Sequence, residues 1–127
     1  MRFDPDCFRD VLLAAEDLAN GEDSPWMFPD SIPGTLAPYT LREVKYHVNQ
    51  CINAGYLRKG AEYIDRSFEI IDVTSSGHSA IDAIRNPQAH ERAKFDWLSK
   101  VKSGLVDAAA QAFVSVAVEI WKNACLG

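Results

Sequence analysis

The chain of 127 residues is long enough for one domain, or for one domain with an extension. A hydrophobic fraction of 47% and a charged fraction of 24% are ordinary for a soluble globular protein and exclude the composition of a disordered chain. The net charge of −5 is unevenly distributed. Residues 40–66 hold five basic and three acidic side chains, whereas residues 1–39 hold two basic and eight acidic ones, so only the 40–66 block is clearly positive.

The N-terminus lacks the apolar run of a secretory signal, and the longest uncharged stretch near the C-terminus, residues 108–118, is too short to cross a bilayer. We therefore expect a cytoplasmic protein that does not enter a membrane. The three cysteines are widely spaced with no CxxC pair, so no disulfide framework is expected. His47 and Cys51 lie four residues apart, but two ligands do not complete a zinc site, and we expect no metal and no cofactor.

The first predicted helix covers residues 5–19. Asp4 followed by Pro5 is a favourable cap and first-turn pair, apolar residues recur at helical spacing, and Gly21 is a stop signal. The next segment, residues 22–39, contains four prolines and a glycine, which exclude one continuous regular element. Within it, Trp26, Met27 and Phe28 form either a short strand or a lid over the core.

A second helix is predicted over residues 40–54. Thr40 and Glu43 form a capping-box pattern, apolar residues from Leu41 to Ile52 lie on one face, and Gly55 ends the helix. A hairpin follows, with strands over 57–64 and 68–73. Its turn lies either at residues 65–67 or earlier, at the Lys59-Gly60 pair, and the sequence leaves both open.

Three further helices are expected after the hairpin. The third begins after Thr74 or Ser75, turns Ile81 and Ile84 inward and ends at Pro87. The fourth, "PQAHERAKFDWLSKVKSG", is amphipathic, with apolar positions at Phe95, Leu98 and Val101. The fifth, "GLVDAAAQAFVSVAVEIWKNACLG", is apolar nearly all round, which predicts a helix that must be buried.

This order of elements is that of a winged helix. The predicted fold class is mainly α with a small β-hairpin, as a winged helix-turn-helix-like domain over residues 1–86 and a C-terminal helical extension over 87–127. The proline-rich connection occupies the place of the usual middle helix, which is therefore expected to be shortened or replaced.

A helix that precedes a hairpin in this fold can enter the major groove of double-stranded DNA, where arginine bonds to guanine and asparagine or glutamine to adenine. Asn53 also lies off the apolar face of the 40–54 helix, but we expect five other residues to face the groove: Arg42, Lys45, Tyr46, Asn49 and Gln50. On the hairpin, Arg58, Lys59 and Arg66 would contact phosphates. The leading hypothesis is a DNA-binding transcriptional regulator.

The alternative is a protein-binding adaptor on the same scaffold. Polar residues on the outer side of an amphipathic helix are what any solvated face shows, and fold does not determine function. We expect no enzyme activity, because the chain has no glycine-rich phosphate loop, no nucleophile elbow and no HExxH motif. His47 is expected to be a helix residue with a local hydrogen bond, His78 to have a capping or packing role, and Asp82 with Arg85 to form a surface pair.

A domain of about 85 residues is too small to wrap an all-apolar fifth helix, so we expect a homodimer through the C-terminal helices. Pairing would bury one set of residues on a two-fold interface: Val106, Phe113, Val116, Ile120 and Trp121. The alternative is that the helix folds back along the first helix and completes the core of a monomer.

Three ordered segments, "FRDVLLAAEDL", "EVKYHVNQCINAGYL" and "VTSSGHSAIDAIRN", resemble the domain of unknown function 2513 family, which is bacterial and phage-associated. The matching motif positions are Arg9 to Leu13 with Glu16, Tyr46 to Val48 with Ala54 to Leu57, and Gly77-His78 with Ile81 to Arg85. This chain departs from the family pattern in its proline-rich 22–39 segment, at Ser79-Ala80 and at His90. The resemblance implies the fold and brings no established activity, although the helix-hairpin pattern is also similar to winged-helix repressors.

Overall fold

The structure is a computed structural model, and it describes residues 3–19, 26–28, 38–65, 68–105 and 109–126. The helices and strands of these residues are α1 (Pro5–Ala19), β1 (Trp26–Phe28), α2 (Leu41–Asn53), β2 (Leu57–Glu62), β3 (Phe68–Val73), α3 (Ser75–Ile84), α4 (Pro87–Lys102) and α5 (Ala110–Leu126). The predicted class, mainly helical with a small antiparallel hairpin, is confirmed. No helix among these residues is long and apolar enough to cross a bilayer.

The first two helices begin at the caps that the sequence predicts. The side chain of Asp4 accepts a hydrogen bond of 2.9 Å from the backbone N–H of Asp6, and Pro5 occupies the first helical position. At α2, Thr40 Oγ1 accepts from the Glu43 N–H at 3.1 Å, and the Glu43 carboxylate accepts from the Thr40 N–H at 3.2 Å. This reciprocal pair is the predicted capping box.

Two further caps set the corner between α3 and α4. Thr74, the first of the two expected candidates, caps α3 by accepting from the Gly77 N–H at 3.0 Å. Asn86 caps α4 by accepting from the N–H of Gln88 at 3.0 Å, with Pro87 at the start of the helix. Because proline cannot continue α3, the chain turns there and α4 begins in a new direction.

The start of α3 docks closely on the end of α2. The Thr74 N–H donates to the Tyr56 carbonyl at 3.0 Å, and the Thr74 hydroxyl donates to the Gly55 carbonyl at 2.6 Å. A Cβ at Gly77 would lie 2.3 Å from the Tyr56 oxygen, so only glycine fits this approach. Gly55 itself has a φ of +82°, the left-handed conformation in which glycine ends a helix.

The sheet has the strand order β1-β3-β2, with both pairs antiparallel. Trp26 lies opposite Ile70, so the Trp26–Phe28 segment is a strand and the lid alternative is wrong. Strand β2 ends at Glu62, two residues earlier than expected. The hairpin therefore does not turn at Lys59-Gly60, although the β2–β3 register shifts on both sides of Lys59.

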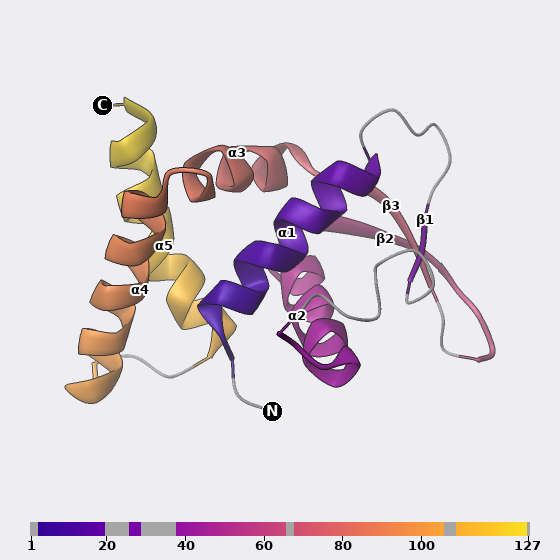
Figure 1. The fold of residues 1–127 in the computed structure, drawn as a ribbon, viewed down its shortest axis with the longest axis horizontal. Coiled ribbons are helices and arrows are strands. Elements are labelled where there is room, and N and C mark those ends of the chain that lie inside the picture. Colours follow the sequence, from indigo (N-terminus) through magenta and orange to yellow (C-terminus); the bar gives the residue numbers. More distant parts are fainter. Residues whose placement is uncertain (1–2, 20–25, 29–37, 66–67, 106–108, 127) are drawn as a thin grey trace.

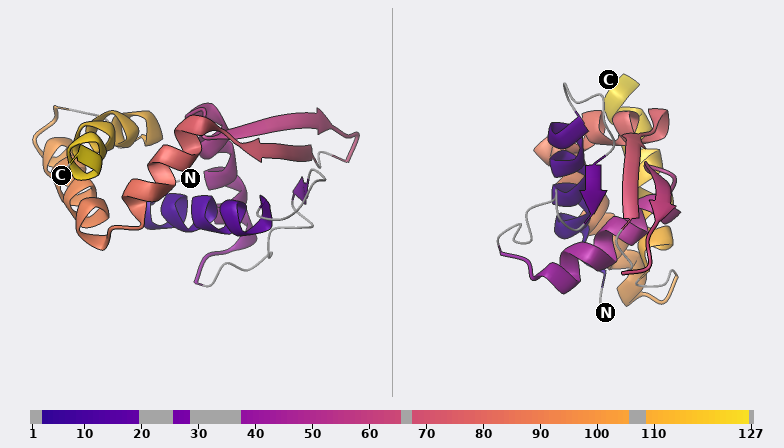
Figure 2. Two further views of the ribbon diagram at one scale, coloured as in Figure 1. Left: turned by 90° about the horizontal axis from the view of Figure 1, so that it is seen from above. Right: turned by 90° about the vertical axis from the view of Figure 1, so that its right-hand side faces the viewer.

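A strand between the first two helices that pairs with the second hairpin strand, and a helix directly before the hairpin, give the winged-helix arrangement. Figures 1 and 2 show the sheet projecting at one end, the α4–α5 pair at the other, and α1, α2 and α3 between them. The connection from 19 to 40, where the middle helix was expected to be shortened or replaced, contains β1, and its residues 20–25 and 29–37 are outside the described residues.

The C-terminal helices share the core of the winged-helix part through Phe113 of α5, whose side chain is fully buried. Its ring centroid lies 5.5 Å from that of Phe3, 6.2 Å from Phe8, 5.7 Å from Trp97 and 6.3 Å from Trp121. Helix α5 packs mainly on α4 and α3. Residues from both parts of the predicted 1–86 and 87–127 division therefore form one continuous cluster.

The expectation that the fifth helix is apolar all round is wrong. Its outer side carries a polar stripe at helical spacing, all of it exposed: Gln111, Ser115, Glu119 and Lys122. Its inner side is buried within the same chain: Ala110, Phe113, Val116, Ala117 and Trp121. The helix also begins at Ala110, so Leu105, which the prediction placed in it, precedes it and is 74% exposed.

The predicted dimer interface needs a corresponding correction. Phe113, Val116 and Trp121 are buried by their own chain, and Ile120 is half-buried, so these side chains do not offer a free apolar surface. Val106 lies outside the described residues. One chain covers the helix without a second copy, because α3 and α4 supply the packing surface. The expected homodimer stays a prediction, but the need to cover an all-apolar fifth helix no longer supports it.

Candidate nucleic-acid interface

Helix α2 divides into a buried side and a fully exposed side. Val44, His47, Val48 and Cys51 are each 0% exposed. The exposed residues occur at intervals of three, four and four positions, which places them on one face: Arg42, Lys45, Asn49 and Asn53. Three of them were predicted to face the DNA groove, and Asn53 completes the row.

The two cations of this face are available to a ligand. Within the described part of the chain, neither Arg42 nor Lys45 makes an ion pair with a carboxylate. The acid between them, Glu43, turns back to the N-terminus of α2, where its carboxylate accepts from the Thr40 N–H and hydroxyl at 3.2 and 3.1 Å. The capping box therefore removes the nearest acid from competition for the two cations.

The other two residues predicted to face the groove lie on the flanks of this face. Tyr46 is half-buried, and its ring packs edge-on against His47 with centroids 4.9 Å apart. Gln50 is half-buried and borders a hollow of about 50 Å³ together with Ala110 and Gln111, at the start of α5. Helix α5 thus limits how much of Gln50 can reach a groove.

The hairpin presents a mixed surface. Arg58 is exposed and lies opposite Asp72 in the β2–β3 register. The Lys59 ammonium lies 3.4 Å from Glu62 and 4.8 Å from the centroid of the Phe68 ring, so its charge is already engaged. Arg66, the third predicted phosphate contact, lies outside the described residues. Residues 57–73 hold three basic and four acidic side chains, which gives this hairpin no positive surplus.

His47 is a structural residue inside the winged-helix core, as expected. The Asp4 N–H donates to Nε2 at 2.9 Å, so the ring proton sits on Nδ1, which donates to the Glu43 carbonyl at 2.7 Å. Burial lowers the pKa of His47, and the hydrogen bond to the Glu43 carbonyl only partly opposes this. The neutral ring ties the start of α1 to the first turns of α2.

A second cluster joins α1 to α3 through residues of two family-like motifs. The buried carboxylate of Glu16 pairs with the Arg85 guanidinium and lies 3.7 Å from Nδ1 of His78. Arg85 also lies 3.7 Å from Asp82, the surface pair that was expected. The contact with Glu16 was not predicted, and the only sequence signal for it is that both residues belong to the matched motifs.

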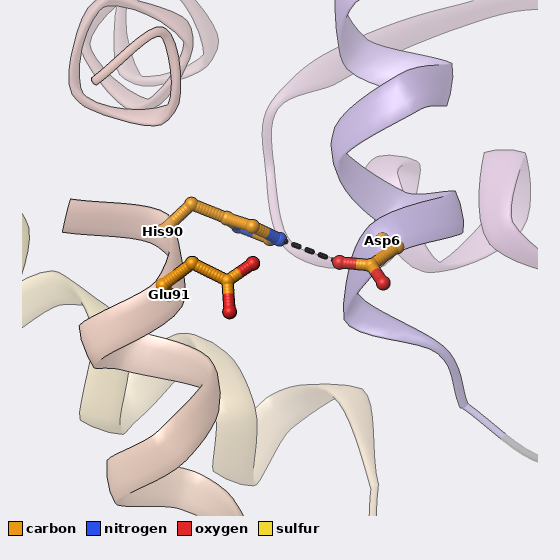
Figure 3. A group of neighbouring side chains, drawn as sticks. All are labelled: Asp6, His90 and Glu91. Carbon is orange, nitrogen blue, oxygen red and sulfur yellow. Dashed lines mark hydrogen bonds and ion pairs between the residues drawn. The ribbon is translucent and has the colours of Figure 1, made fainter. Parts of the chain in front are cut away.

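A third cluster joins α1 to α4, and Figure 3 shows Asp6 facing His90, with Glu91 beside them. Asp6 Oδ1 accepts from Nε2 of buried His90 at 2.9 Å, and Oδ2 accepts from the Lys94 ammonium at 2.8 Å. Burial alone raises the pKa of the Asp6 carboxyl, but the hydrogen bonds and charges of Lys94 and His90 outweigh it and lower the pKa.

The same cluster has a spacing that a metal ion can use, because ligand atoms of Asp6, His90 and Glu91 lie within 4.8 Å of one another. Both Asp6 oxygens, however, already hold protein donors, one of them the Lys94 cation. A divalent ion there would have to displace the ammonium group. The arrangement is therefore that of an interhelical polar contact.

Comparison with known proteins identifies one family. A family model described as "Hypothetical protein (DUF2513)" matches residues 2–110, which include the described α2 face and most of the contacts above. No curated protein and no solved structure matches the chain. The resemblance inferred from the three motifs is thereby confirmed.

Proposed function

This chain belongs to the DUF2513 family, and we propose that it binds double-stranded DNA through the exposed face of α2 and acts as a regulator of transcription. The observation that carries the proposal is the row Arg42, Lys45, Asn49 and Asn53 on the helix that leads into the hairpin. An α-helix fits the major groove, and these side-chain types match base edges and phosphates.

The side chains divide the work of recognition. Arginine bonds to guanine with two parallel hydrogen bonds, and asparagine does the same to adenine, so Arg42, Asn49 and Asn53 can read sequence. Lys45 and Arg58 are the exposed cations that can contact phosphates on either side of the groove. Asn53 replaces the half-buried Gln50 in the predicted set.

The acidic N-terminal third is less repulsive toward DNA than its composition implies. Asp6 is bound by His90 and Lys94, Asp10 by Arg9 at 2.9 Å and by the Tyr39 hydroxyl at 2.9 Å, and Glu16 by Arg85. These contacts pair three carboxylates with cations of the same chain. Glu16 is buried and Asp6 and Asp10 are half-buried, so water weakens these charge pairs less than it would at the surface. These three carboxylates therefore reduce the positive potential of Arg42 and Lys45 less than unpaired carboxylates would.

The test is a titration of a labelled random-sequence duplex at about 50 mM salt, where phosphate contacts are strongest. Replacing Arg42 and Lys45 together by alanine is expected to weaken binding by at least about tenfold and to make affinity less sensitive to salt. The matched control replaces Arg92 and Lys122, two exposed cations outside the interface, by alanine. It makes the same change in net charge.

Equal losses in the two double variants would mean that the protein attracts DNA only by general charge. Unchanged binding in the Arg42→Ala, Lys45→Ala variant would remove α2 as the interface. Sequence reading is tested separately by selecting duplexes from a random pool with wild type and with Asn49→Ala, because loss of a base contact changes the selected sequence more than the bulk affinity.

A second candidate function is a protein-binding adaptor, which the surface of the hairpin favours. Its outer side carries exposed apolar residues, Tyr63 at 46%, Ile64 at 105% and Ile71 at 48%, beside the surplus of carboxylates. Exposed apolar groups suit a protein partner better than a phosphate backbone.

Salt response separates the two functions. A DNA-binding protein loses duplex affinity steeply as salt rises from about 50 to 200 mM, whereas an adaptor has no measurable affinity for random duplex even at the lower value. The Ile64→Ser variant is a second way to separate the two functions. It removes an exposed apolar side chain that only an adaptor would use and leaves the cations of α2 intact, so it should weaken protein binding but not duplex binding.

A further inference from the structure

Helix α4 carries an exposed stripe that its own chain does not cover. Phe95 is 74% exposed and Leu98 is 36% exposed, whereas Trp97 on the opposite side is buried. Glu91 and Lys102 lie at the two ends of the same stripe and are also exposed. The intervals of four, three and four positions between Glu91, Phe95, Leu98 and Lys102 are those of the seam of a helix pair.

We propose that a second copy of this chain packs antiparallel against this stripe of α4. The stripe is self-complementary when two copies run in opposite directions about a two-fold axis midway between positions 96 and 97. Position 95 then lies opposite position 98 of the other copy, and position 91 opposite position 102. Phe95 meets Leu98 twice, and Glu91 meets Lys102 twice.

Charge selects the second copy as the occupant. Glu91 and Lys102 are both exposed, and no ion pair involves either of them in the described part of the chain. The Glu91 carboxylate lies within 4.8 Å of the Asp6–His90 contact and interacts with the Lys94 charge, so Lys102 across the axis would be an additional partner for it. An antiparallel copy brings opposite charges together at both ends, whereas a parallel copy in register brings glutamate to glutamate and lysine to lysine. An uncharged apolar stripe would give no such preference between occupants.

The proposal differs from the expected dimer in the surface that it uses. The stripe lies on α4, and it includes none of the α5 residues that are buried inside the chain. Leu105, which is 74% exposed, follows the end of α4 and therefore lies outside the stripe. The stripe also shares no residue with the exposed face of α2, so the proposal does not rest on the proposed function.

The contact is short. The 11 steps from Glu91 to Lys102 span about 17 Å along the helix. A stripe of this length buries less surface than the roughly 800 Å² per partner of a standard stable interface. We therefore expect a concentration-dependent dimer with a dissociation constant on the order of 10 μM. If DNA is also bound, two copies of α2 would be presented together, as two-fold operator sites require.

The first experiment measures mass by sedimentation and light scattering on the full chain without DNA, from about 1 to 200 μM, a range chosen to bracket the expected dissociation constant. Wild type is expected to rise from 14.1 kDa toward twice that mass. Phe95→Asp should remain a monomer throughout, because it places two carboxylates in the apolar centre. The control, Ser115→Asp on the exposed side of α5, should dimerise like wild type.

The second experiment tests the register by reversing charges. Glu91→Lys alone and Lys102→Glu alone each place like charges across both ends and should weaken dimerisation by at least about fivefold. The double variant restores opposite pairing and should return to within about twofold of wild type. An equal mixture of the two single variants should form a mixed dimer.

Three outcomes would overturn the proposal. One is a wild-type mass that stays at 14.1 kDa at the highest concentration. Another is a dimer that Phe95→Asp leaves intact, since the contact would then lie elsewhere. The third is a double variant no stronger than the single variants, which would exclude the antiparallel register. Because DNA is absent throughout, none of these outcomes bears on the proposed DNA binding.

Discussion

The carboxylate of Glu16 on α1 pairs with the guanidinium of Arg85, the residue that follows α3, across 69 positions of sequence. The glutamate is 7% exposed and the arginine side chain 54% exposed, so the pair is anchored inside and open to water on one side. Among the described residues, removing the arginine leaves this buried carboxylate with His78, at 3.7 Å, as its remaining ion-pair neighbour.

Arg85→Ala is therefore expected to lower the free energy of unfolding by about 2 kcal/mol, the cost of leaving a charged group without its partner. The measurement is urea unfolding at pH 7. Arg92→Ala, which removes an exposed arginine from α4, should cost less than about 0.5 kcal/mol. If the two variants lose the same amount, the Glu16 contact contributes nothing beyond general charge.

At Gly77, packing and helix propensity predict opposite changes in stability on substitution by alanine. In α3, propensity alone makes alanine about 1 kcal/mol more stable than glycine. The new Cβ, however, would lie 2.3 Å from the Tyr56 oxygen and 2.8 Å from a Val73 methyl, both held by the surrounding backbone. We expect Gly77→Ala to destabilise the protein by about 2 kcal/mol, measured by thermal and urea unfolding.

Gly104 is the contrasting position, since a Cβ there meets nothing within 4 Å and only the φ of +77° opposes a substitution. Gly104→Ala should therefore cost about 1 kcal/mol. A Gly77→Ala variant that is more stable than wild type would show that α3 is free to move away from the end of α2.

The pH dependence of stability should reflect His47. Its pKa is lower in the folded protein than the ordinary value of 6.5, so the unfolded chain binds a proton first as the pH falls. The contribution of the neutral ring is fully present above pH 6.5 and is lost as the pH falls through the lowered pKa. We expect the free energy of unfolding to decline from pH 7 to pH 5, and to decline less in His47→Gln.

Asp6 contributes in a lower pH range than His47. Its folded pKa lies below the ordinary 3.8, so the stability it contributes is present above pH 3.8 and is lost as the pH falls through the folded pKa. Wild-type stability should therefore show a separate decline below pH 3.8, outside the interval assigned to His47. If His47→Gln has the same slope as wild type in that interval, the buried ring does not govern the acid response.

Phe113 tests whether the C-terminal helices fold with the rest. Its ring contacts Phe3 and Phe8 at the start of the chain as well as Trp97 on α4, so its removal opens a cavity shared by both parts. Phe113→Ala is expected to cost about 3–5 kcal/mol and to shift a single unfolding transition. Ser115→Ala, on the exposed side of the same helix, is the matched control.

Hydrogen exchange on the same variants decides whether residues 1–86 form a separate unit. Protection should fall together in α1, α2 and α5 in Phe113→Ala, because one cluster links them. Loss of protection confined to α4 and α5 would instead support the predicted division of the chain at residue 86.

The elements that the sequence predicts correctly are those with local signals. The Asp4-Pro5 start of α1, the Thr40 and Glu43 cap and the boundary at Pro87 each depend on residues a few positions apart. The winged-helix order followed from these elements. The many alanines make α5 look apolar nearly all round in the sequence, and this conceals the exposed polar row from Gln111 to Lys122.

The parts that the sequence did not predict are contacts between distant segments. Nothing near His90 indicates that its ring donates to Asp6, 84 positions earlier, and nothing near Gln50 indicates that α5 begins beside it. The candidate interface shows the same limit. Helical spacing placed Arg42, Lys45 and Asn49 on the outer face correctly, but tertiary packing decided that Tyr46 is half-buried.

The hairpin gives the last prediction, which concerns the proposed DNA binding. Glu62 holds the Lys59 ammonium at 3.4 Å, so in wild type this cation is less available to a phosphate than the exposed Arg58. Arg58→Ala should reduce the salt slope of duplex binding by about one, as expected for one lost phosphate contact, and Lys59→Ala should reduce it less.

Glu62→Gln should strengthen binding about threefold, because it frees Lys59 and removes a repulsive charge. Glu119→Gln on α5, with the same charge change far from the hairpin, separates this local effect from net charge, and equal gains in both variants would exclude the hairpin from the interface.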